Sequence, residues 1–425
     1  MTGTSVENWD VVVCGAGVAG LATARALAGR GLRLLLLEKQ KKPVPIAKGE
    51  VLQPGSIRIL EEWGLVPRLE ERGAVRLDRL SVREGDGTQV MLFDYTTLAS
   101  QHRSLLTHDY PVICEVLANS LGDAVAWRRG ALVEELLRDE AGRVAGVRVA
   151  EGGRKYEVRA ALVVAADGRS SRLRQMAGVS AEPVTYTHRL VSFDIAGVPA
   201  LPPEVTAYVT EQGLRLLYPL PHGRARLYVQ VGPEALRGAG RDELAALCNG
   251  LTHDTPALAP LLAPLLASLD SRQIFTLVRF TASRLAVPGL ALVGEAAHSV
   301  HPMAAQGMNT AIADAHALAG QLAAVGSLEP ASVDHALRGY HSERSTWVDH
   351  IDRMSHDATR MITDTSWQGR LLGRRMLRHT SGNPRLSYVA TYNMAALGVR
   401  PFTVLDRFHQ LGLPDPRANK RPAWS

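Results

Sequence analysis

One stretch decides the fold of this chain: residues 10–38 read DVVVCGAGVAGLATARALAGRGLRLLLLE. The valine run predicts a buried strand, the small residues after the glycines predict a helix, and the leucine run predicts a second buried strand that ends on Glu38. Strand, glycine-rich turn, helix, strand and acid in this order form the β-α-β unit that binds dinucleotides. The acid is placed to accept hydrogen bonds from a ribose.

Each glycine of the turn has its own physical task. Gly15 makes the tight turn, Gly17 lets a pyrophosphate approach the backbone, and Gly20 lets the helix pack closely on the strand. The helix begins at Val18 and Ala19, so its free N–H groups and partial positive charge face the pyrophosphate. A glycine-rich turn alone could be only a turn, but the flanking strands and the acid favour dinucleotide binding.

Composition narrows the class of protein. The chain has 425 residues, enough for two or three domains, and a net charge of +6 with basic residues scattered among acids, so we expect no nucleic-acid partner. Cys14, Cys114 and Cys248 are far apart and form no C-x-x-C pair, which argues against a disulfide framework and predicts a cytoplasmic protein. The polar first ten residues predict no signal peptide, and no apolar run predicts a transmembrane segment. The oligomeric state stays open.

A second motif, LVVAADGRSSRLR at 162–174, predicts a buried strand that ends on Asp167 and Gly168. Ser171 is placed to cap the helix that follows. The motif could be a plain strand, turn and helix, or it could belong to a cofactor site.

A third motif, GLALVGEAAHSVHPMAAQGMN at 289–309, predicts a strand that delivers Gly294 and Glu295. A loop with Pro302 follows, and a helix of small residues opens at Gly307.

Two histidines of this motif, His298 and His301, have a spacing that metal sites use. No third ligand is adjacent, and the loop has another explanation, so we expect no metal.

The segment that follows the β-α-β unit resembles a known family of proteins. Residues 49–55 read GEVLQPG and lead into a predicted helix at 57–63. This block and its spacing from Glu38 resemble the squalene epoxidases and the wider class A FAD-dependent monooxygenases, the para-hydroxybenzoate hydroxylase superfamily. The second motif resembles the Asp-Gly motif of that superfamily, and the third resembles its Gly-Asp fingerprint. The resemblance covers residues 8–345, although the GEVLQPG block alone could be only a helix cap.

The resemblance implies one non-covalent FAD held by all three motifs. By this resemblance, Asp167 lies at the pyrophosphate region of FAD and along the path of the nicotinamide cofactor. The helix start at Gly307 stabilises the negative charge of the reduced flavin. Pro302 and Gly307 lie near the reactive flavin face, and no side chain is needed as a nucleophile or acid-base catalyst. The expected cofactor-binding residues are Gly15, Gly17, Val18, Ala19, Gly20, Glu38, Lys39, Lys48, Cys114, Ala131, Asp167, Gly294, Glu295, Gln306, Gly307, Met308 and Asn309.

Three positions depart from the family pattern. Cys114 stands where an Arg is usual, on a predicted helix at 112–121. Ile46 stands where an Arg usually precedes the GEVLQPG block, and Lys48 is the nearby substitute. Glu295 stands where the family generally has Asp, and its carboxylate reaches one methylene further.

We expect an α/β fold with a Rossmann-like FAD-binding domain, an inserted substrate domain built on an antiparallel sheet, and a helical C-terminal region. The predicted ranges are 1–75, 101–180 and 284–345 for the FAD-binding domain, 76–100 and 181–283 for the substrate domain, and 346–425 for the helical region. Tyr218, Tyr228 and Phe275 are candidate pocket residues, although an aromatic residue in a sheet is more often plain core. Only one β-α-β fingerprint is present, so we expect no separate NAD(P)H domain.

The resemblance also implies a reaction. NADH or NADPH reduces FAD, dioxygen adds at C4a, and the C4a-hydroperoxyflavin transfers oxygen to a bulky aromatic, polyketide or isoprenoid intermediate by hydroxylation or epoxidation. A flavin halogenase is disfavoured because no W-x-W-x-x-P motif occurs. A prenyl-chain reductase and a non-catalytic flavin-binding protein remain alternatives.

Overall fold

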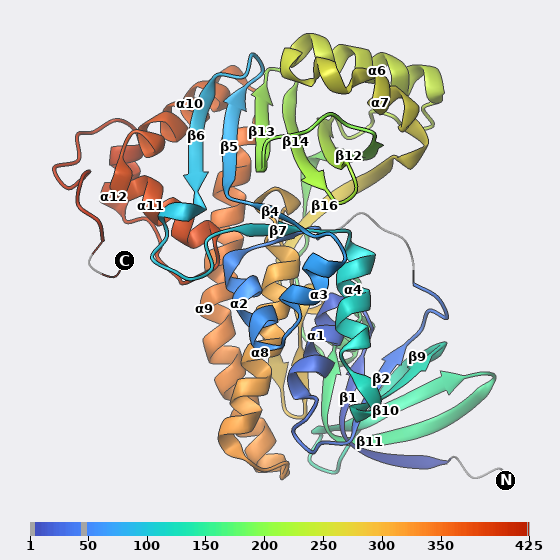
Figure 1. The fold of residues 1–425 in the computed structure, drawn as a ribbon. Helices are drawn as coiled ribbons and strands as arrows, with labels where there is room; N and C mark the ends of the chain where they lie inside the picture. The colour runs from blue at the N-terminus through green and yellow to red at the C-terminus, as the bar shows by residue number, and fades with distance from the viewer. Residues whose placement is uncertain (1–4, 44–48, 423, 425) are drawn as a thin grey trace.

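The structure is a computed structural model that describes residues 5–43, 49–422 and 424. Figure 1 shows a largely parallel sheet in its lower half, an antiparallel sheet in its upper half, and the long helix α9 (Pro330–Thr363) beside both. The α/β class with two sheet systems and a helical C-terminal region is confirmed. Among the described residues, no helix combines the length and apolarity needed to cross a bilayer.

The first sheet is built around β1 (Val6–Cys14), whose last four residues are all buried. Val13 of β1 lies beside Leu36 on one side and Val164 on the other, and both neighbouring strands are parallel to it. Strands buried on both faces need continuous apolar runs, and the valine and leucine runs provide them. In spatial order the strands are β17 (Ala286–Val287), β18 (Leu290–Leu292), β11 (Arg154–Ala165), β1 (Val6–Cys14), β2 (Leu34–Glu38) and β8 (Val125–Arg129). Off this path, β10 (Val144–Glu151) pairs antiparallel with β11, and β9 (Ala131–Arg138) pairs antiparallel with β10.

Helices cover this sheet, and α8 packs directly on α1. The helices are α1 (Val18–Leu27), α2 (Pro54–Glu62), α3 (Val66–Glu71), α4 (Tyr110–Asn119), α5 (Arg172–Met176), α8 (Gly307–Val325) and α9 (Pro330–Thr363). The short 3₁₀ turns are η1 (Tyr95–Thr97), η2 (Gly122–Ala124), η5 (Gly294–Ala296) and η6 (Pro302–Ala304).

The second sheet has the order β19 (His298–Ser299), β16 (Gln273–Thr281), β12 (Val184–Ala196), β15 (Arg224–Val231), β14 (Gly213–Leu220), β13 (Glu204–Thr210), β5 (Arg79–Glu84) and β6 (Gln89–Asp94). Its neighbours are antiparallel as predicted, except that β13 and β5 are parallel. The exception arises because β5 and β6 form a hairpin from an earlier part of the chain that joins the edge of the later meander.

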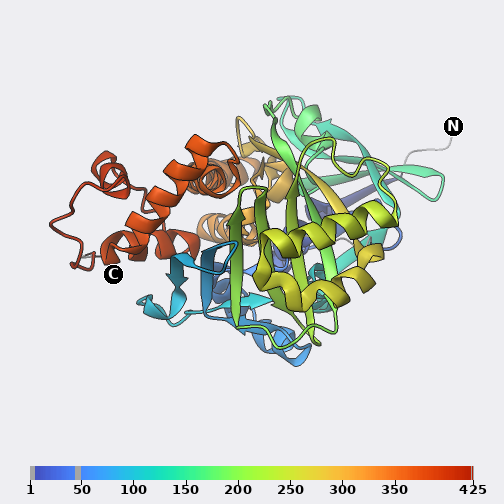
Figure 2. The ribbon, with the colours of Figure 1, turned by 90° about the horizontal axis from the view of Figure 1, so that it is seen from above.

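The two faces of the second sheet pack against different parts of the chain. One face is covered by α6 (Arg241–Asp254) and α7 (Leu262–Ala267), with η3 (Pro256–Leu261) and η4 (Leu269–Ser271) beside them, as Figure 2 shows. The other face packs against the C-terminal helices and the residues around Met303. A small third sheet of β3 (Val51–Leu52), β7 (Leu105–Thr107) and β4 (Val75–Leu77) completes the strands.

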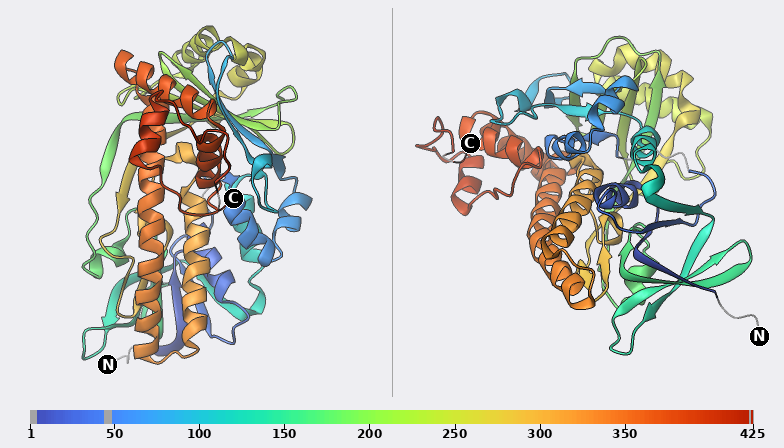
Figure 3. Two further views of the ribbon diagram at one scale, coloured as in Figure 1. Left: turned by 90° about the vertical axis from the view of Figure 1, so that its left-hand side faces the viewer. Right: turned by 60° about the horizontal axis from the view of Figure 1, so that its bottom comes forward.

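The C-terminal helices follow α9, which stands beside α8 along the molecule (Figure 3). They are α10 (Trp367–Ser381), α11 (Pro384–Met394) and α12 (Val404–Gln410). Pro384 begins α11, because proline is tolerated in the first turn of a helix, where its missing N–H has no partner to lose.

Candidate flavin and substrate site

The three sequence motifs meet at one edge of the first sheet. Strands β1, β11 and β18 are parallel neighbours, so their carboxyl ends, where ligands bind in such sheets, lie together. The loops after them touch: a Cβ on Gly15 would lie 2.3 Å from the oxygen of Ala166, and a Cβ on Gly294 would lie 2.7 Å from the Cβ of Ala19. Gly294 and Ala19, which are 275 positions apart in the chain, thus lie side by side.

The glycines of the first turn differ in what surrounds them. A Cβ on Gly20 would lie 1.8 Å from the oxygen of Gly15, so close packing inside the protein excludes a side chain there. A Cβ on Gly17 would meet only the hydroxyl of Tyr110, at 3.4 Å. The space in front of Gly17, at the N-terminus of α1, is therefore not filled by protein, and this cradle fits a pyrophosphate.

The end of β2 carries the groups expected at the ribose. The Glu38 carboxylate is half-buried and accepts hydrogen bonds from the N–H groups of Ala16 and Gln40, both at 2.7 Å. Lys39 is exposed beside it, and Ala131 is buried at the start of β9. Lys48 and Ile46 lie outside the described residues.

Tyr110 is a site residue that sequence reasoning missed. It begins α4, and its hydroxyl accepts a hydrogen bond from the N–H of Val18 at 3.3 Å. Burial raises the pKa of Tyr110, and the nearby Cys114 and Glu295 raise it further. Cys114 and Glu295 therefore lie near Tyr110, and their contact with the cofactor stays a prediction. Pro111 marks the start of α4 in the sequence, but this signal does not indicate that Tyr110 contacts Val18, which is 92 positions away.

Asp167 has a local structural role. Its carboxylate accepts hydrogen bonds from the Ser171 hydroxyl at 2.5 Å and from the N–H groups of Arg172 and Leu173 at 2.9 and 3.2 Å. It therefore stabilises the N-terminus of α5 together with Ser171. Its predicted contact with the cofactor stays a prediction.

The loop before α8 presents two residues to open space. Pro302 is exposed, and a Cβ on Gly307 would find no atom within 4 Å. Between them Met303 and Ala304 are buried, and Ala305 adopts a left-handed φ of 49°. This pattern fits the prediction that Pro302 and Gly307 border the flavin.

The other predicted residues of this loop are held by protein contacts. Asn309 accepts a hydrogen bond from the N–H of Gln53 at 2.8 Å and donates one to the oxygen of Val51 at 2.9 Å, which fixes the GEVLQPG block on α8. Met308 packs against Gly49, where an added Cβ would lie 3.0 Å from it. Gln306 donates to the oxygen of Met394, and its own side-chain oxygen is buried without a partner among the described residues.

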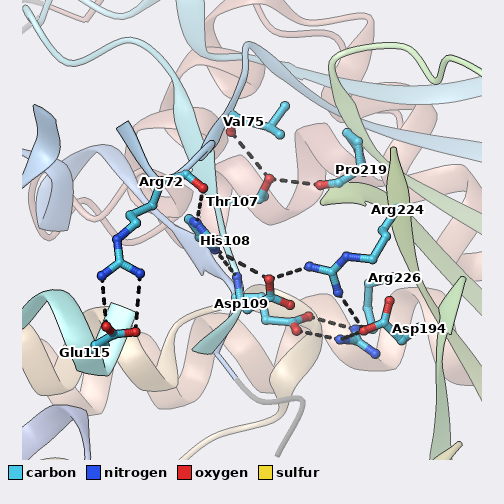
Figure 4. A network of polar contacts seen from close by, with 11 residues as sticks. Arg72, Val75, Thr107, His108, Asp109, Glu115, Asp194, Pro219, Arg224 and Arg226 are labelled. Carbon is cyan, nitrogen blue, oxygen red and sulfur yellow. Dashed lines mark hydrogen bonds and ion pairs between the residues drawn. The ribbon is translucent and has the colours of Figure 1, made fainter. Parts of the chain in front are cut away.

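A buried ionic network joins the GEVLQPG block to the second sheet. Glu50 is 2% exposed; its carboxylate accepts hydrogen bonds from Arg226 at 2.7 and 2.9 Å and from the Tyr218 hydroxyl at 2.8 Å. Arg226 also contacts Asp194, and Figure 4 shows that Arg224 continues the chain of ion pairs. A charge buried in this way needs a partner, so the network fixes how the two sheets meet.

The other end of this network reaches the start of α4. Arg224 bonds Asp194 at 2.8 Å and also pairs with Asp109, whose backbone N–H donates to the ring of His108 (Figure 4). Pairing with His108 and Arg224 holds the pKa of Asp109 well below its usual range. The sequence predicted none of these pairs.

The predicted pocket aromatics pack in a row. Ring centroids are 6.4 Å apart for Tyr218 and Tyr228, and 6.1 Å apart for Tyr228 and Phe275. Tyr218 and Tyr228 are buried, and none of the three lines the main cavity. Their predicted role as pocket residues stays untested.

A largely apolar cavity of about 490 Å³, named the main cavity here for its apolar wall, lies between the second sheet, α9 and the C-terminal helices, and a more polar pocket of about 550 Å³ lies beside Tyr186 and His356. Met303 and Ala304 form part of the wall of the main cavity, so it reaches the loop that carries Pro302 and Gly307. Its size and its apolar wall with few polar groups are typical of a small-molecule site. The apolar lining includes Val82, Met91, Phe93, Leu216, Met354, Met361, Met394 and Phe402, and the polar lining includes His350, Asn393, Arg407 and Gln410.

The two histidines of the third motif have separate partners. His298 Nε2 contacts the Asp314 carboxylate at 2.7 Å, whereas His301 Nε2 lies 3.0 Å from His188 Nε2. In the part of the chain that the structure describes, no cluster of ligands suited to a metal occurs.

Comparisons with known proteins agree with this geometry. The family model described as "FAD binding domain" matches residues 8–355. The 6-methylpretetramide 4-monooxygenase of Streptomyces rimosus is 30% identical over 328 residues, which cover 72% of this chain and 73% of that protein. The rifampicin monooxygenase of Streptomyces venezuelae is 29% identical over 353 residues, or 79% of this chain and 68% of that protein. The structure of PqsL from Pseudomonas aeruginosa, described as a probable FAD-dependent monooxygenase, has a TM-score of 0.75 at 26% identity and covers 86% of this chain and 99% of that one. The chain therefore belongs to the FAD binding domain family, among the class A FAD-dependent monooxygenases.

Proposed function

We propose that this enzyme uses NAD(P)H and dioxygen to hydroxylate a bulky aromatic or polyketide substrate in the main cavity. The observation that carries the proposal is the largely apolar cavity of about 490 Å³ whose wall includes Met303 and Ala304. This volume suits a substrate of several fused rings. The named substrates of two relatives, 6-methylpretetramide and rifampicin, support the polyketide class.

The residues at the meeting point of the three motifs would hold FAD without a covalent bond. Gly17 and the start of α1 would receive the pyrophosphate, Glu38 a ribose, and Glu295 a ribityl hydroxyl, with Pro302 and Gly307 beside the ring system. When bound, the flavin supplies the activation of dioxygen. The balanced reaction consumes substrate, O2, NAD(P)H and a proton, and it yields hydroxylated substrate, water and NAD(P)+.

The protein's own share is positioning and the exclusion of water. The apolar wall would keep the reacting region dry, and His350 would orient a polar group of the substrate. The ring of His350 contacts the Asn393 side-chain oxygen through Nε2 at 3.2 Å, so Nε2 carries the proton. Burial lowers the pKa of His350, which favours the neutral ring at the cavity wall. We assign the second sheet to the substrate domain, as the sequence predicted, and place the enzyme in the cytoplasm, where NAD(P)H is available.

The test incubates purified protein with FAD, NADPH or NADH, labelled dioxygen and a panel of polycyclic phenols and polyketides. We expect NAD(P)H oxidation to rise with substrate and the product to carry one labelled oxygen atom. Product that has gained hydrogen instead of oxygen would favour the prenyl-chain reductase alternative, and an epoxide would favour alkene substrates. Flavin binding without any substrate-stimulated oxidation would contradict the proposal.

A further inference from the structure

Positive charge is concentrated in the last part of the chain. Residues 364–425 contain ten basic and three acidic residues, a net charge of +7, whereas the whole chain carries +6. Three acids from outside the segment pair with some of these arginines: Glu211 with Arg370, Glu84 with Arg374, and Asp357 with Arg407. Counting these acids still leaves a net charge of +4, so this end of the molecule is cationic.

The same region exposes large apolar side chains. Val404, Trp367 and Leu371 are 77%, 67% and 63% exposed, which is unusual for side chains of this size. We call the following set the C-terminal face: Trp367, Leu371, Leu372, Val404, Leu405, Phe408, Leu411 and Leu413. Most of the exposed large apolar side chains of the described residues belong to it.

Direct contacts bring the two helices of this face together. Arg375 of α10 donates a hydrogen bond to the oxygen of Leu411 at 2.7 Å, and Gly412 packs against His379 and Arg375. Figures 1 and 2 show α10 and the segment that follows it at one outer edge of the molecule, away from the first sheet. Arg375 thus places a cation between the apolar side chains of α10 and those that follow α12.

The helix α12 has two sides with different roles. Val404, Leu405 and Phe408 point outward and are exposed, whereas Arg407 and Gln410 line the main cavity. A single short helix therefore separates the apolar outer face from the apolar cavity.

We propose that the C-terminal face adsorbs to an anionic lipid bilayer, in the plane of the interface. Helices that lie in a membrane interface typically expose Trp, Leu and Phe beside Arg. Their apolar side chains enter the headgroup region, and their cations contact acidic lipids. Contact between two copies through this face is disfavoured, because it would bring two cationic surfaces together. Adsorption would also put the wall of the cavity against the phase in which an apolar substrate dissolves.

The test measures co-sedimentation of the purified full-length protein with vesicles of phosphatidylglycerol and phosphatidylcholine in equal parts. We expect binding that weakens with salt and is lost on vesicles of phosphatidylcholine alone. The double variant Leu371→Ser, Phe408→Ser should lower the affinity for these vesicles by about tenfold or more, because two membrane-buried side chains are removed. Val184→Ser removes an apolar side chain that is 59% exposed on another surface, and this control should bind like the wild type.

A second readout reports the orientation. Trp367 should move into a less polar environment, so vesicles should shift the fluorescence to shorter wavelength in the wild type and much less in Trp367→Phe. Circular dichroism of each variant checks that the fold is intact. The proposal is overturned by three outcomes: no vesicle binding, equal loss in the Val184→Ser control, or a concentration-dependent dimer that the double variant abolishes.

Discussion

The proposed pyrophosphate cradle and the proposed substrate cavity of this enzyme are built in opposite ways. The cradle comes from a short stretch of chain, where Gly15 and Gly17 shape the turn between β1 and α1 and Gly20 lies in the first turn of α1. The cavity takes its wall from β5, β13, α9 and the C-terminal helices, which are far apart in sequence. The first can be recognised by a motif, whereas the second exists only once the domains have packed. Cofactor and substrate contacts should therefore respond to different mutations.

The largest effect is expected at the cradle. Gly17→Val should lower FAD affinity by more than about 100-fold, because a side chain would occupy the space of the pyrophosphate. The fold should survive, because Gly17 has an extended backbone with φ of −76° and a Cβ there meets only Tyr110. Flavin fluorescence titration and a thermal melt measure the two quantities. Gly15→Val is the contrasting variant: with φ of +109° and a Cβ 2.3 Å from Ala166, it should fail to fold stably.

A second prediction concerns the buried carboxylate that supports the third motif. Asp314 accepts hydrogen bonds from the Gly294 N–H at 3.0 Å and from Arg344 at 2.8 Å, besides its contact with His298. Asp314→Asn should lower the free energy of unfolding by about 3–5 kcal/mol, because Arg344 would keep a buried charge without its partner. Urea unfolding measures the difference, and a loss below about 1 kcal/mol would contradict the assigned role.

The pH dependence of that carboxylate has a defined sign. Burial raises the pKa of Asp314, but His298 and Arg344 outweigh it and lower the pKa to about 2. The unfolded value is about 3.9, so the stabilisation is fully present above about pH 4 and is lost as the pH falls towards 2. Wild type should lose stability in that window, and Asp314→Asn should lose less.

The cavity gives a third prediction, which separates it from the cradle. Ala358 lies on α9 and lines the cavity. Ala358→Phe should lower kcat/KM for a polycyclic substrate by about 10- to 100-fold through loss of space, with FAD affinity unchanged. Ala358→Ser keeps the volume nearly constant and should retain most activity. A parallel fall in FAD affinity would show that cavity and cradle are not separate.

The smallest effect is expected at Glu295. Glu295→Gln keeps the length but loses charge assistance, so FAD should bind about 5- to 30-fold more weakly. Glu295→Ala should be worse, and Glu295→Asp should recover part of the affinity in a loop adapted to the longer side chain. Equal affinities in a flavin titration of all three variants would show that Glu295 points away from the cofactor.

The sequence predicted the parts of the fold whose causes are local. The β-α-β unit follows from apolar periodicity and from turn residues in a few consecutive positions. It could not predict the ion pair of Glu50 with Arg226, because these residues are 176 positions apart and only the packing of two sheets brings them together. For the same reason, the sequence did not predict the parallel pairing of β5 with β13.

The candidate site also has a part that local sequence predicts and a part that depends on packing. The close contacts of Gly15 and Gly20 are those that the first motif predicts, and the open surroundings of Gly307 are those that the third motif predicts. Asp167 and Asn309 instead use their polar atoms within the protein, and a motif cannot distinguish a residue that binds a ligand from one that braces the loop beside it. Tyr110 was missed because its contact with Val18 spans 92 positions.

The most direct test of the central claim measures FAD binding and oxygen insertion on the same three proteins: wild type, Gly17→Val and Ala358→Phe. Each is titrated with FAD and then given NADPH, labelled dioxygen and a polycyclic phenol that the wild type accepts. We predict flavin and labelled product in the wild type, neither in Gly17→Val, and full flavin with little labelled product in Ala358→Phe. Labelled product from Gly17→Val without bound flavin, or unlabelled product from the wild type, would contradict the assignment of this chain as a flavin monooxygenase.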